Sequence, residues 1–380
     1  HYVLEPRPPL SGVNQPERLA CVEVDLDALR RNFARLRSTI GDAAILAVVK
    51  AEAYGHGAVP VARCLEQEGA DWLGVALAEE GAQLREAGLK SPILVLGQIH
   101  AAQIPYMVAG DLVPTLSSLE QLEMWSDSGE PIEVHLKLDT GMHRLGIAPA
   151  DWQRAADLLA RSPRMVLTGL MSHLAETISP DSARNPRQQA LFAEGLELFS
   201  PRVAAGRPPL VHLCSSAGAL HLADYRHGLV RVGLALYGID PAQRRDDLEG
   251  VMQVSGPIVH IVEVADGEAV GYGSSWVATR PSRIGIVAVG YGDGYPYRAS
   301  SASRARVGSA DVPLVGQVNM DMVQIDLTDS PAVLGDRVIL LARSDTEGVT
   351  AAQLAKISQT SVYETLCRFA VRLPRRYVAR

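Results

Sequence analysis

Short apolar runs alternate with amphipathic segments from residue 45 to residue 238, and this pattern limits the possible folds more than any other feature of the sequence. Apolar runs bridged by helical segments are typical of a parallel sheet covered by helices. The bridging segments include Val59–Glu68, Glu79–Ala87 and Arg184–Leu198. The apolar runs are Ile45–Lys50, Trp72–Leu77, Ile93–Gly97, Leu112–Ser117, Ile132–Asp139, Val166–Leu174, Leu210–Ser216 and Leu229–Gly238.

Eight such units in about 200 residues predict an α/β fold, a (β/α)8 barrel of the TIM type. An open, doubly wound sheet is the alternative, because it uses the same alternation of strands and helices. The first sixteen residues contain Pro6, Pro8, Pro9 and Pro16, so we expect residues 1–20 to form an extended N-terminal arm. The barrel is then expected to span residues 21–240.

The pattern changes after Gly238, which predicts a second domain over residues 241–380. Short β-rich runs follow one another without helical segments between them, as in a mainly antiparallel β domain. One amphipathic helix is expected at about Ala351–Ile357, and the run Cys21–Leu26 is a candidate strand of this second domain. The β-rich runs are Ile258–Val264, Ile284–Val289, Val323–Leu327 and Val338–Leu341.

The composition is that of a soluble globular protein, with 47% hydrophobic residues, 21% charged residues and a formal net charge of −7. Its basic residues are dispersed, which argues against a nucleic-acid partner or an anionic membrane surface. No apolar run approaches the roughly 20 residues that a membrane-spanning helix needs. We therefore expect a cytoplasmic protein, and a sequence that begins at His1 leaves open whether a leader was removed.

Neither the cysteines nor the histidines follow a metal-binding pattern, so we expect no metal. A disulfide framework is also not expected in a chain of this size. The cysteines, which form no Cys-x-x-Cys pair, are Cys21, Cys64, Cys214 and Cys367. The histidines considered as zinc ligands are His212, His221, His227 and His260.

Lys50 stands at the carboxyl end of an apolar run and is followed by Tyr54-Gly-His-Gly57. Burying an ammonium group costs several kcal/mol unless the group is paired or neutral. Active sites of barrels lie at the carboxyl ends of the strands, and a desolvated lysine can form a Schiff base with an aldehyde cofactor. The alternative is a strand-end lysine whose side chain simply reaches solvent.

Two further groups of polar residues follow apolar runs. Arg144 comes after the turn Asp139-Thr-Gly-Met-His143, and its guanidinium suits a carboxylate, although a loop salt bridge is the alternative. Ser216 could be no more than a helix N-cap, but a helix start is also a phosphate site. Its position and that of Gly233-Leu234 match the loops after strands seven and eight, where barrels commonly bind phosphate.

The segment Lys50-Ala-Glu-Ala-Tyr54-Gly-His-Gly57 resembles the cofactor-lysine signature of the alanine racemase family. The resemblance continues from about residue 20 to the end of the chain. It implies that Lys50 carries pyridoxal 5'-phosphate as a Schiff base and that Tyr54 hydrogen-bonds the cofactor phosphate. It also implies that Arg144 binds the substrate carboxylate and that Lys137 is N-carboxylated and orients this arginine.

The same resemblance assigns the remaining site residues. Ser216 and the amides of Gly233 and Leu234 are expected to hold the phosphate. Arg231 faces the pyridine nitrogen, and His173 lies beside the ring and contacts Arg231. In the second domain, composition alone would make Tyr272 a turn residue. The resemblance makes Tyr272 the second catalytic base and Met320 a substrate contact, both supplied by the partner subunit of a homodimer.

The expected function is therefore the interconversion of L-alanine and D-alanine by two bases, Lys50 and Tyr272, which supplies D-alanine for peptidoglycan. A broader or serine-preferring racemase and a non-catalytic protein that carries pyridoxal phosphate on a barrel are the alternatives. Three departures from the family pattern concern the substrate range. The stretch Val371–Arg375 lacks a tyrosine before its Arg-Leu-Pro-Arg element, Ser215 precedes Ser216, and Asn319 precedes Met320.

Overall fold

The computed structural model describes residues 18–203, 209–369 and 372–379, which pack into two compact units. Among these residues, the barrel unit comprises 24–203, 209–252, 361–367 and 377–379, and the β unit comprises 18–23, 253–360, 368–369 and 372–376. The prediction divides the chain only at residues 20 and 240. In the structure, each unit also includes short stretches from near the ends of the chain, so the chain passes between the two units more than once. The predicted N-terminal arm lies outside the described residues up to residue 17.

Eight parallel strands of the described chain form the sheet of the barrel unit, in the order β8-β7-β6-β5-β4-β3-β2-β9. The last strand pairs with the first, because Ala44 and Ile45 of β2 lie opposite Leu229 and Val230 of β9. The sheet thus curls back on itself, and the Arg231 N–H donates to Cys214 O where β8 and β9 meet. The strands are β2 (Ala44–Val48), β3 (Trp72–Val75), β4 (Ile93–Val95), β5 (Leu112–Leu116), β6 (Ile132–Lys137), β7 (Met165–Met171), β8 (Leu210–His212) and β9 (Leu229–Val232).

This strand order confirms the predicted barrel and excludes the doubly wound alternative. A doubly wound sheet reverses its strand order at an internal switch point, whereas here the order runs without reversal from β2 to β8. The strands are buried almost throughout, which explains their continuous apolar sequences.

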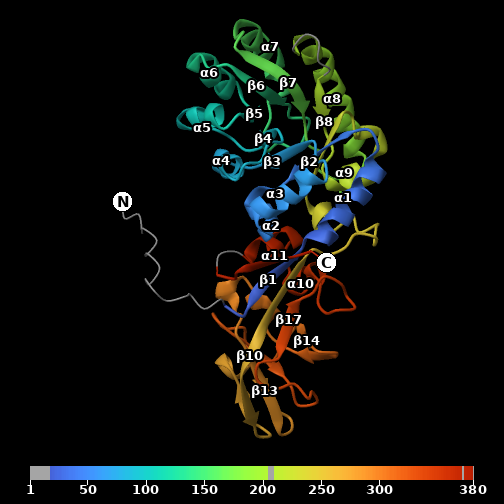
Figure 1. Ribbon diagram of the computed structural model, residues 1–380. Coiled ribbons are helices and arrows are strands. Elements are labelled where there is room, and N and C mark those ends of the chain that lie inside the picture. Colours follow the sequence, from blue (N-terminus) through green and yellow to red (C-terminus); the bar gives the residue numbers. More distant parts are fainter. Residues whose placement is uncertain (1–17, 204–208, 370–371, 380) are drawn as a thin grey trace, which may run out of the picture. The chain divides into compact units, whose positions relative to one another are not determined.

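Helices cover the outer side of the strands, as Figure 1 shows for α4 to α7. In α7, the residues Trp152, Ala155, Ala156 and Leu159 are buried at helical spacing and turn one apolar face toward the sheet. The helices are α1 (Leu26–Ile40), α2 (Lys50–Gly55), α3 (Ala58–Gln67), α4 (Ala78–Glu86), α5 (Ile104–Ala109), α6 (Leu119–Ser128), α7 (Trp152–Arg161), α8 (Arg184–Phe199) and α9 (Ser216–His221). The 3-10 helix η5 (Leu234–Tyr237) follows β9.

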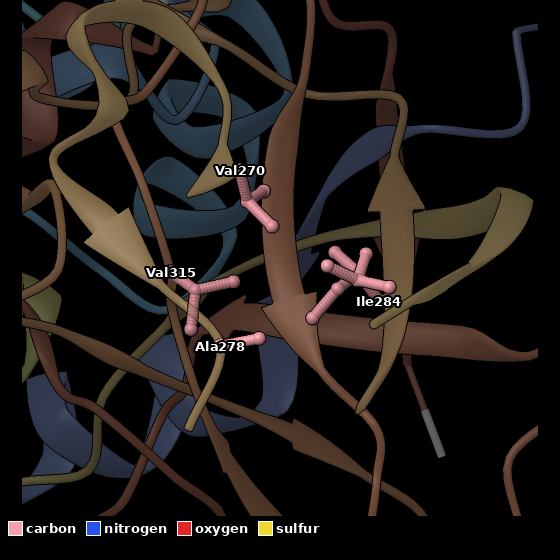
Figure 2. Close-up of a cluster of buried hydrophobic side chains, with 5 residues drawn as sticks. Val270, Ala278, Ile284 and Val315 are labelled. Atoms are coloured by element: carbon pink, nitrogen blue, oxygen red, sulfur yellow. The ribbon is translucent and has the colours of Figure 1, made fainter. Parts of the chain in front are cut away.

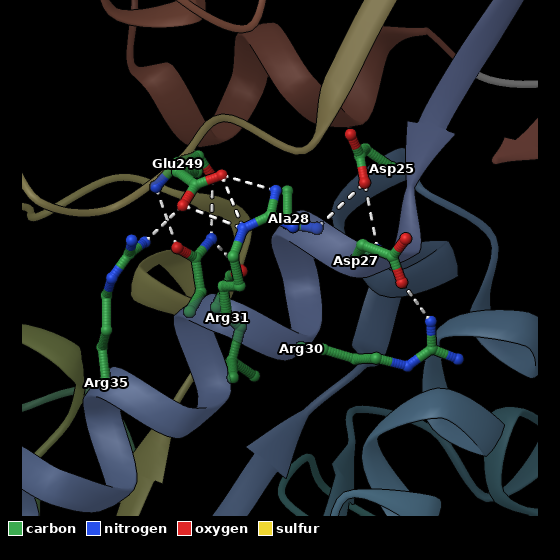
Figure 3. A network of polar contacts seen from close by, with 9 residues as sticks. Asp25, Asp27, Ala28, Arg30, Arg31, Arg35 and Glu249 are labelled. Atoms are coloured by element: carbon green, nitrogen blue, oxygen red, sulfur yellow. Dashed lines mark hydrogen bonds and ion pairs between the residues drawn. The ribbon is translucent and has the colours of Figure 1, made fainter. Parts of the chain in front are cut away.

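A polar network on α1 holds the segment that leaves the barrel after η5 (Figure 3). The Glu249 carboxylate accepts hydrogen bonds from Arg31 and lies 2.7 Å from Arg35 Nη1. The buried Asn32 side chain donates to Leu236 O at 3.0 Å and to Glu249 O at 2.7 Å. Because Leu236 belongs to η5, α1 fixes both this 3-10 helix and the chain that follows it.

The strands of the β unit form a mainly antiparallel sheet with the order β15-β14-β17-β10-β1-β18, to which β13 and β16 add beside β10. β1 (Cys21–Asp25) lies between β10 and β18, which confirms that the predicted strand joins the second sheet, although Leu26 at the end of the predicted run already begins α1. The helix α10 spans Ala351–Ile357 as predicted. The other strands are β10 (Met252–Val264), β11 (Ala269–Val270), β12 (Trp276–Val277), β13 (Ser282–Val287), β14 (Arg304–Val307), β15 (Ala310–Pro313), β16 (Val323–Asp326), β17 (Arg337–Leu341) and β18 (Arg375–Val378). The helix α11 (Val362–Arg368) follows α10 in the chain and belongs to the barrel unit up to Cys367.

A small apolar core in the β unit secures the turn between β11 and β12. Val270, Ala278 and Ile284 pack with Val315 and Val264, and all five side chains are buried (Figure 2). Val270 immediately precedes the turn that carries Tyr272, while Ala278 follows β12. Both ends of this turn are therefore anchored by buried apolar surface.

The four cysteines all lie in the described part of the chain and none of them forms a disulfide. Among the described helices, none combines the length and the apolar character that crossing a membrane requires.

Candidate active site

The side chains predicted to carry chemistry gather at the carboxyl end of the barrel strands. Lys137 is the last residue of β6, and Arg231 is the last but one of β9. Lys50 and His173 each follow their strand, β2 or β7, by two residues. Because the strands are parallel, these ends lie on one rim of the barrel, where barrel enzymes have their active sites.

Lys50 opens a turn of left-handed helix. The backbone φ angles of Ala51, Glu52, Ala53 and Tyr54 are 52°, 54°, 51° and 53°. None of these residues is glycine, and each L-residue costs roughly 1–2 kcal/mol in this conformation, or roughly 4–8 kcal/mol for the turn. A turn of this kind persists only where the surrounding structure imposes it.

His56, Glu52 and the backbone of α11 hold the far end of this turn. The buried His56 ring lies with Nδ1 2.9 Å from Ala53 O and stacks on Tyr237 at 4.4 Å. Glu52 accepts a hydrogen bond from Ala58 N at 3.0 Å, which caps α3. At Gly55 a Cβ would collide with the carbonyl oxygen of Leu366, so the chain passes there only as glycine.

Arg231 is buried, and its guanidinium makes five hydrogen bonds within the barrel. One nitrogen, Nη1, donates to Nδ1 of His212 and to His212 O, both at 3.0 Å. The other, Nη2, donates to Nδ1 of His173 at 3.0 Å and to the carbonyls of Ser172 and Leu213. Burial lowers the pKa of the Arg231 guanidinium to about 10, so it remains a cation near neutral pH.

These bonds fix the protonation of three histidines. A guanidinium has donors and no acceptor, so Nδ1 of His173 and of His212 must both accept. Burial, followed by the charge of Arg231, lowers the pKa of His173 and His212 well below the ordinary value, so both rings are neutral. The proton of each therefore sits on Nε2, and His212 donates it to Nδ1 of the buried His135 at 2.9 Å.

The rim carries an excess of positive charge. Burial, with contributions from Arg231 and Arg144, lowers the pKa of Lys137 to about 8. Burial and then Arg144 also lower the pKa of Lys50. Arg144 is exposed on the loop after β6, yet its charge acts on both lysines, His173 and Arg231. A cluster of this sign favours anionic ligands such as phosphate and carboxylate.

The turn that presents Arg144 is fixed by Asp139. Its Oδ1 accepts from the N–H groups of Gly141 and His143 at 3.0 and 3.1 Å, and its Oδ2 lies 3.0 Å from His143 Nδ1. Backbone donors converging on one carboxylate make a compact turn. Arg144 follows directly, so its backbone position is determined by this turn.

The residues predicted to hold phosphate also come together. Ser216 Oγ accepts from Gly233 N at 3.0 Å and from Ala235 N at 3.3 Å, which joins the start of α9 to the start of η5. A Cβ at Gly233 would lie 2.6 Å from the Tyr54 hydroxyl, so this hydroxyl approaches the backbone closely. In the described chain the Leu234 N–H has no hydrogen-bond acceptor, whereas the Gly233 N–H is already bonded to Ser216.

Tyr272 and Met320 lie in the β unit, where they line one hollow of about 460 Å³ together with Tyr291 and Tyr297. Tyr272 is 72% exposed and Met320 is 54% exposed. The left-handed φ angles of Gly271 and Gly273 place Tyr272 at the tip of its turn. The structure thus brings the two predicted residues of the second domain together on one surface.

Sequence reasoning missed His135 and His212, which bond to each other next to Arg231. His135 and Lys137 alternate along β6, which is the spacing of side chains on one face of a strand. That spacing was a usable signal for His135. His212 was considered only as a zinc ligand. Among the described residues, no group of three or more histidine, cysteine, aspartate or glutamate side chains could hold a metal ion.

Comparison with known proteins agrees with this geometry. Residues 24–241 match the family model described as alanine racemase, N-terminal domain, and residues 251–377 match alanine racemase, C-terminal domain. The chain belongs to the alanine racemase family. This membership confirms the predicted resemblance and the predicted enzyme class, an isomerase.

Individual alanine racemases resemble the chain over nearly its whole length. The alanine racemase of Nostoc sp. is 38% identical over 371 residues, which cover 94% of this chain and 95% of the relative. The structure of alanine racemase from Streptomyces lavendulae is similar with a TM-score of 0.89 and 31% identity, and covers 96% of this chain and 98% of that one. The biosynthetic alanine racemase of Pseudomonas aeruginosa is similar with a TM-score of 0.85 and 34% identity, over 95% of this chain and 100% of that one.

Proposed function

We propose that the chain interconverts L-alanine and D-alanine by a two-base reaction that uses pyridoxal 5'-phosphate. The observation that carries this proposal is a desolvated lysine, Lys50, at the barrel rim among the cations Lys137, Arg144 and Arg231. An amine of lowered pKa suits covalent attachment of an aldehyde, and the cations suit a phosphate and a carboxylate. The similar proteins named alanine racemase support alanine as the substrate.

The residues present fit this cofactor at both of its ends. Ser216, the unpaired Leu234 N–H and the Tyr54 hydroxyl are polar groups at a helix start, where phosphate binds readily. The Gly233 N–H would join them by exchanging its bond to Ser216 for one to phosphate. Arg231 would face the pyridine nitrogen as a pure donor. When bound, pyridoxal phosphate withdraws electrons from the substrate Cα and so acidifies its proton.

Two bases on opposite faces of the substrate are needed to invert Cα. Lys50 would remove the proton from D-alanine, because its amine is free once the substrate has taken its place on the cofactor. Tyr272 of the partner subunit would remove the proton from L-alanine on the other face. Tyr272 is 72% exposed and Met320 is 54% exposed, so both side chains are accessible to the active site of a partner subunit. Arg144 would bind the substrate carboxylate, with Met320 of the partner subunit beside it.

His173 would assist the tyrosine base. A phenol has a pKa near 10 and needs stabilisation of its phenolate to act near neutral pH. Because Nδ1 of His173 accepts from Arg231, its Nε2–H is the donor available for the phenolate oxygen. The neighbouring Arg231 cation favours the anionic form further.

Lys137 would become N-carboxylated. Its lowered pKa of about 8 leaves part of the amine unprotonated near neutral pH, and such an amine can attack carbon dioxide. The nitrogen forms a bond to carbon and releases a proton, which leaves a carbamate anion. That anion would sit among Arg231 and Arg144, where it would lower the excess positive charge and orient Arg144.

The proposed enzyme works as a homodimer with shared active sites in the cytoplasm, and it supplies D-alanine for peptidoglycan. The barrel domain would hold the cofactor, and the second domain would complete the site of the other subunit. Dilution to the monomer should then abolish racemisation, as measured by activity beside the sedimentation profile. A fully active monomer would contradict the shared site.

The direct test is conversion of L-alanine, compared with L-serine, together with the visible absorbance of the purified protein. Absorbance of a bound aldehyde that disappears in Lys50→Ala, with alanine strongly preferred, would support the proposal. Equal or faster turnover of serine would redirect it to a broader racemase, for which Asn319 and Ser215 leave room. Absorbance without racemisation would point to a protein that carries the cofactor without turnover.

A further inference from the structure

The left-handed turn after Lys50 begins with an N–H that donates to a carboxylate from another element of the barrel. Oε1 of Glu80 lies 2.6 Å from the nitrogen of Ala51, the residue next to Lys50. Glu80 belongs to the first turn of α4, which follows β3. Its other oxygen, Oε2, accepts from Ala76 N at 2.7 Å and from Leu77 N at 3.1 Å.

Glu80 therefore links three backbone donors that belong to two neighbouring strand ends. Hydrogen bonds to a carboxylate are stronger than those to a neutral acceptor, and a carboxylate at a helix start is favoured. Without Glu80, the end of β3 would no longer be joined to Ala51. The first residue of the left-handed turn would then be free to return toward an ordinary backbone conformation. The N–H that Glu80 binds belongs to the peptide group between Lys50 and Ala51, so this bond also restrains the backbone of Lys50.

The charge of Glu80 also acts on Lys50. The groups around the Lys50 amine are Arg144 on the loop after β6, Lys137 on β6, Arg231 on β9, His173 after β7 and the Cys367 thiol on α11. Burial and the Arg144 charge lower the pKa of Lys50, and the carboxylate of Glu80 acts in the opposite direction.

We propose that Glu80 is a positioning residue for Lys50, which holds the left-handed turn so that the amine points at the cofactor aldehyde and which balances part of the positive charge around it. The proposal rests on the proposed attachment of the cofactor to Lys50. A purely structural alternative exists, because Glu80 caps α4 through Ala76 and Leu77. That alternative affects folding stability but not the titration of Lys50.

The reaction of Lys50 with pyridoxal phosphate separates these two roles. The amine nitrogen bonds to the aldehyde carbon, and the aldehyde oxygen leaves as water with both amine hydrogens. We would free the full-length protein of bound cofactor and follow adduct formation by its visible absorbance across a range of pH. Borohydride reduction and mass spectrometry would locate the adduct at Lys50. The plateau rate reports orientation, and the pH midpoint reports the charge near the amine.

Three variants test the proposal. Glu80→Gln keeps the length but loses the charge and one acceptor, so its midpoint should fall by at least about half a unit and its plateau rate by about tenfold. Glu80→Asp keeps the charge but is one methylene too short, so its midpoint should stay and its plateau should fall. Glu79→Gln removes a charge from the same helix start, where Glu79 bonds Gln103, and should change neither.

Each outcome is decisive. A folded Glu80→Gln protein that reacts with the midpoint and plateau of Glu79→Gln would overturn the proposal. If thermal melting shows that Glu80→Gln does not fold, Glu80→Asp decides, and an unchanged plateau in that variant overturns the positioning role. If the wild-type chain forms no adduct at Lys50, the proposed function fails instead, irrespective of Glu80.

Discussion

Arg231 Nη2 lies 3.0 Å from Nδ1 of His173, and this bond determines which nitrogen of the histidine carries the proton. The guanidinium cannot accept, so the proton must be on Nε2. In the same way, Arg231 Nη1 donates to Nδ1 of His212, and Nε2 of His212 then donates to Nδ1 of His135. One buried arginine thus sets the donor and acceptor pattern of three histidines in the centre of the barrel.

Arg231→Lys tests whether the hydrogen bonds of the guanidinium matter, because the variant keeps a buried positive charge at this position. Lysine keeps the charge but has a single nitrogen instead of the planar set of guanidinium donors, so it cannot bond both histidines and the carbonyls at once. We expect a loss of about 2–4 kcal/mol in the free energy of unfolding, measured with urea, and at least a tenfold fall in kcat. Arg226→Lys is the matched control, because Arg226 also donates to backbone carbonyls in the barrel unit. An equal fall in kcat for both variants would contradict the assignment.

In protein kept free of carbon dioxide, so that Lys137 is not carboxylated, its amine should make stability depend on pH in a defined direction. Its folded-state pKa of about 8 lies below the unfolded value of 10.5, so the unfolded chain binds the extra proton between these values. Stability should therefore fall as the pH is lowered from about 10.5 to about 8, by on the order of 3 kcal/mol, and this term should not change further below pH 8. Lys137→Met lacks this term. Urea unfolding of both proteins on either side of this window measures the difference.

Bicarbonate tests the proposed carbamate on the same residue. Carbon dioxide that adds to Lys137 binds the folded state and should raise the melting temperature of the wild-type protein. Lys137→Met should not respond, and Lys90→Met, which alters an exposed lysine, should respond like the wild type. A response that survives in Lys137→Met would place the effect elsewhere.

Gly233→Ala should weaken the binding of pyridoxal phosphate. The added Cβ would lie 2.6 Å from the Tyr54 hydroxyl and push it away from the expected phosphate site. We expect about a tenfold higher dissociation constant in a fluorescence titration. Gly228→Ala is the control, since its Cβ would meet its nearest neighbour only at 4.0 Å. Tyr54→Phe removes the collision, so the double variant should lose less than the sum of the single losses.

Tyr272→Phe should abolish inversion but leave one exchange reaction. Without the second base, racemisation should fall by at least about a hundredfold. Lys50 would still exchange the Cα proton of D-alanine with solvent, which proton magnetic resonance in deuterium oxide detects. Tyr297→Phe changes another exposed tyrosine of the same hollow and should racemise normally. Loss of exchange together with racemisation would show that Tyr272 does more than act as the second base.

The apolar runs predicted the barrel because buried parallel strands need side chains of one kind on both faces. The same reasoning placed Lys50 at the carboxyl end of its strand, where barrel active sites lie, whereas Lys137 was assigned to the site only by the family resemblance. The helix Ala351–Ile357 and the strand at Cys21–Asp25 followed from local patterns as well. The predicted departure at Val371 lies outside the described residues, and its neighbour Arg372 bonds Asp321 at 2.6 Å.

The sequence by itself determined which residues stand at the strand ends, because hydrophobic periodicity is a local property that tertiary contacts seldom reverse. Only the tertiary structure showed that the four residues after Lys50 adopt a left-handed helical conformation. Four consecutive residues other than glycine disfavour a left-handed turn. The turn is nevertheless present, and its first N–H bonds Glu80 while its end passes close to Leu366, both distant in sequence. The tertiary structure also determined which nitrogens of His173, His212 and His135 carry protons, because the pattern follows from the positions of the donors of the buried Arg231 guanidinium.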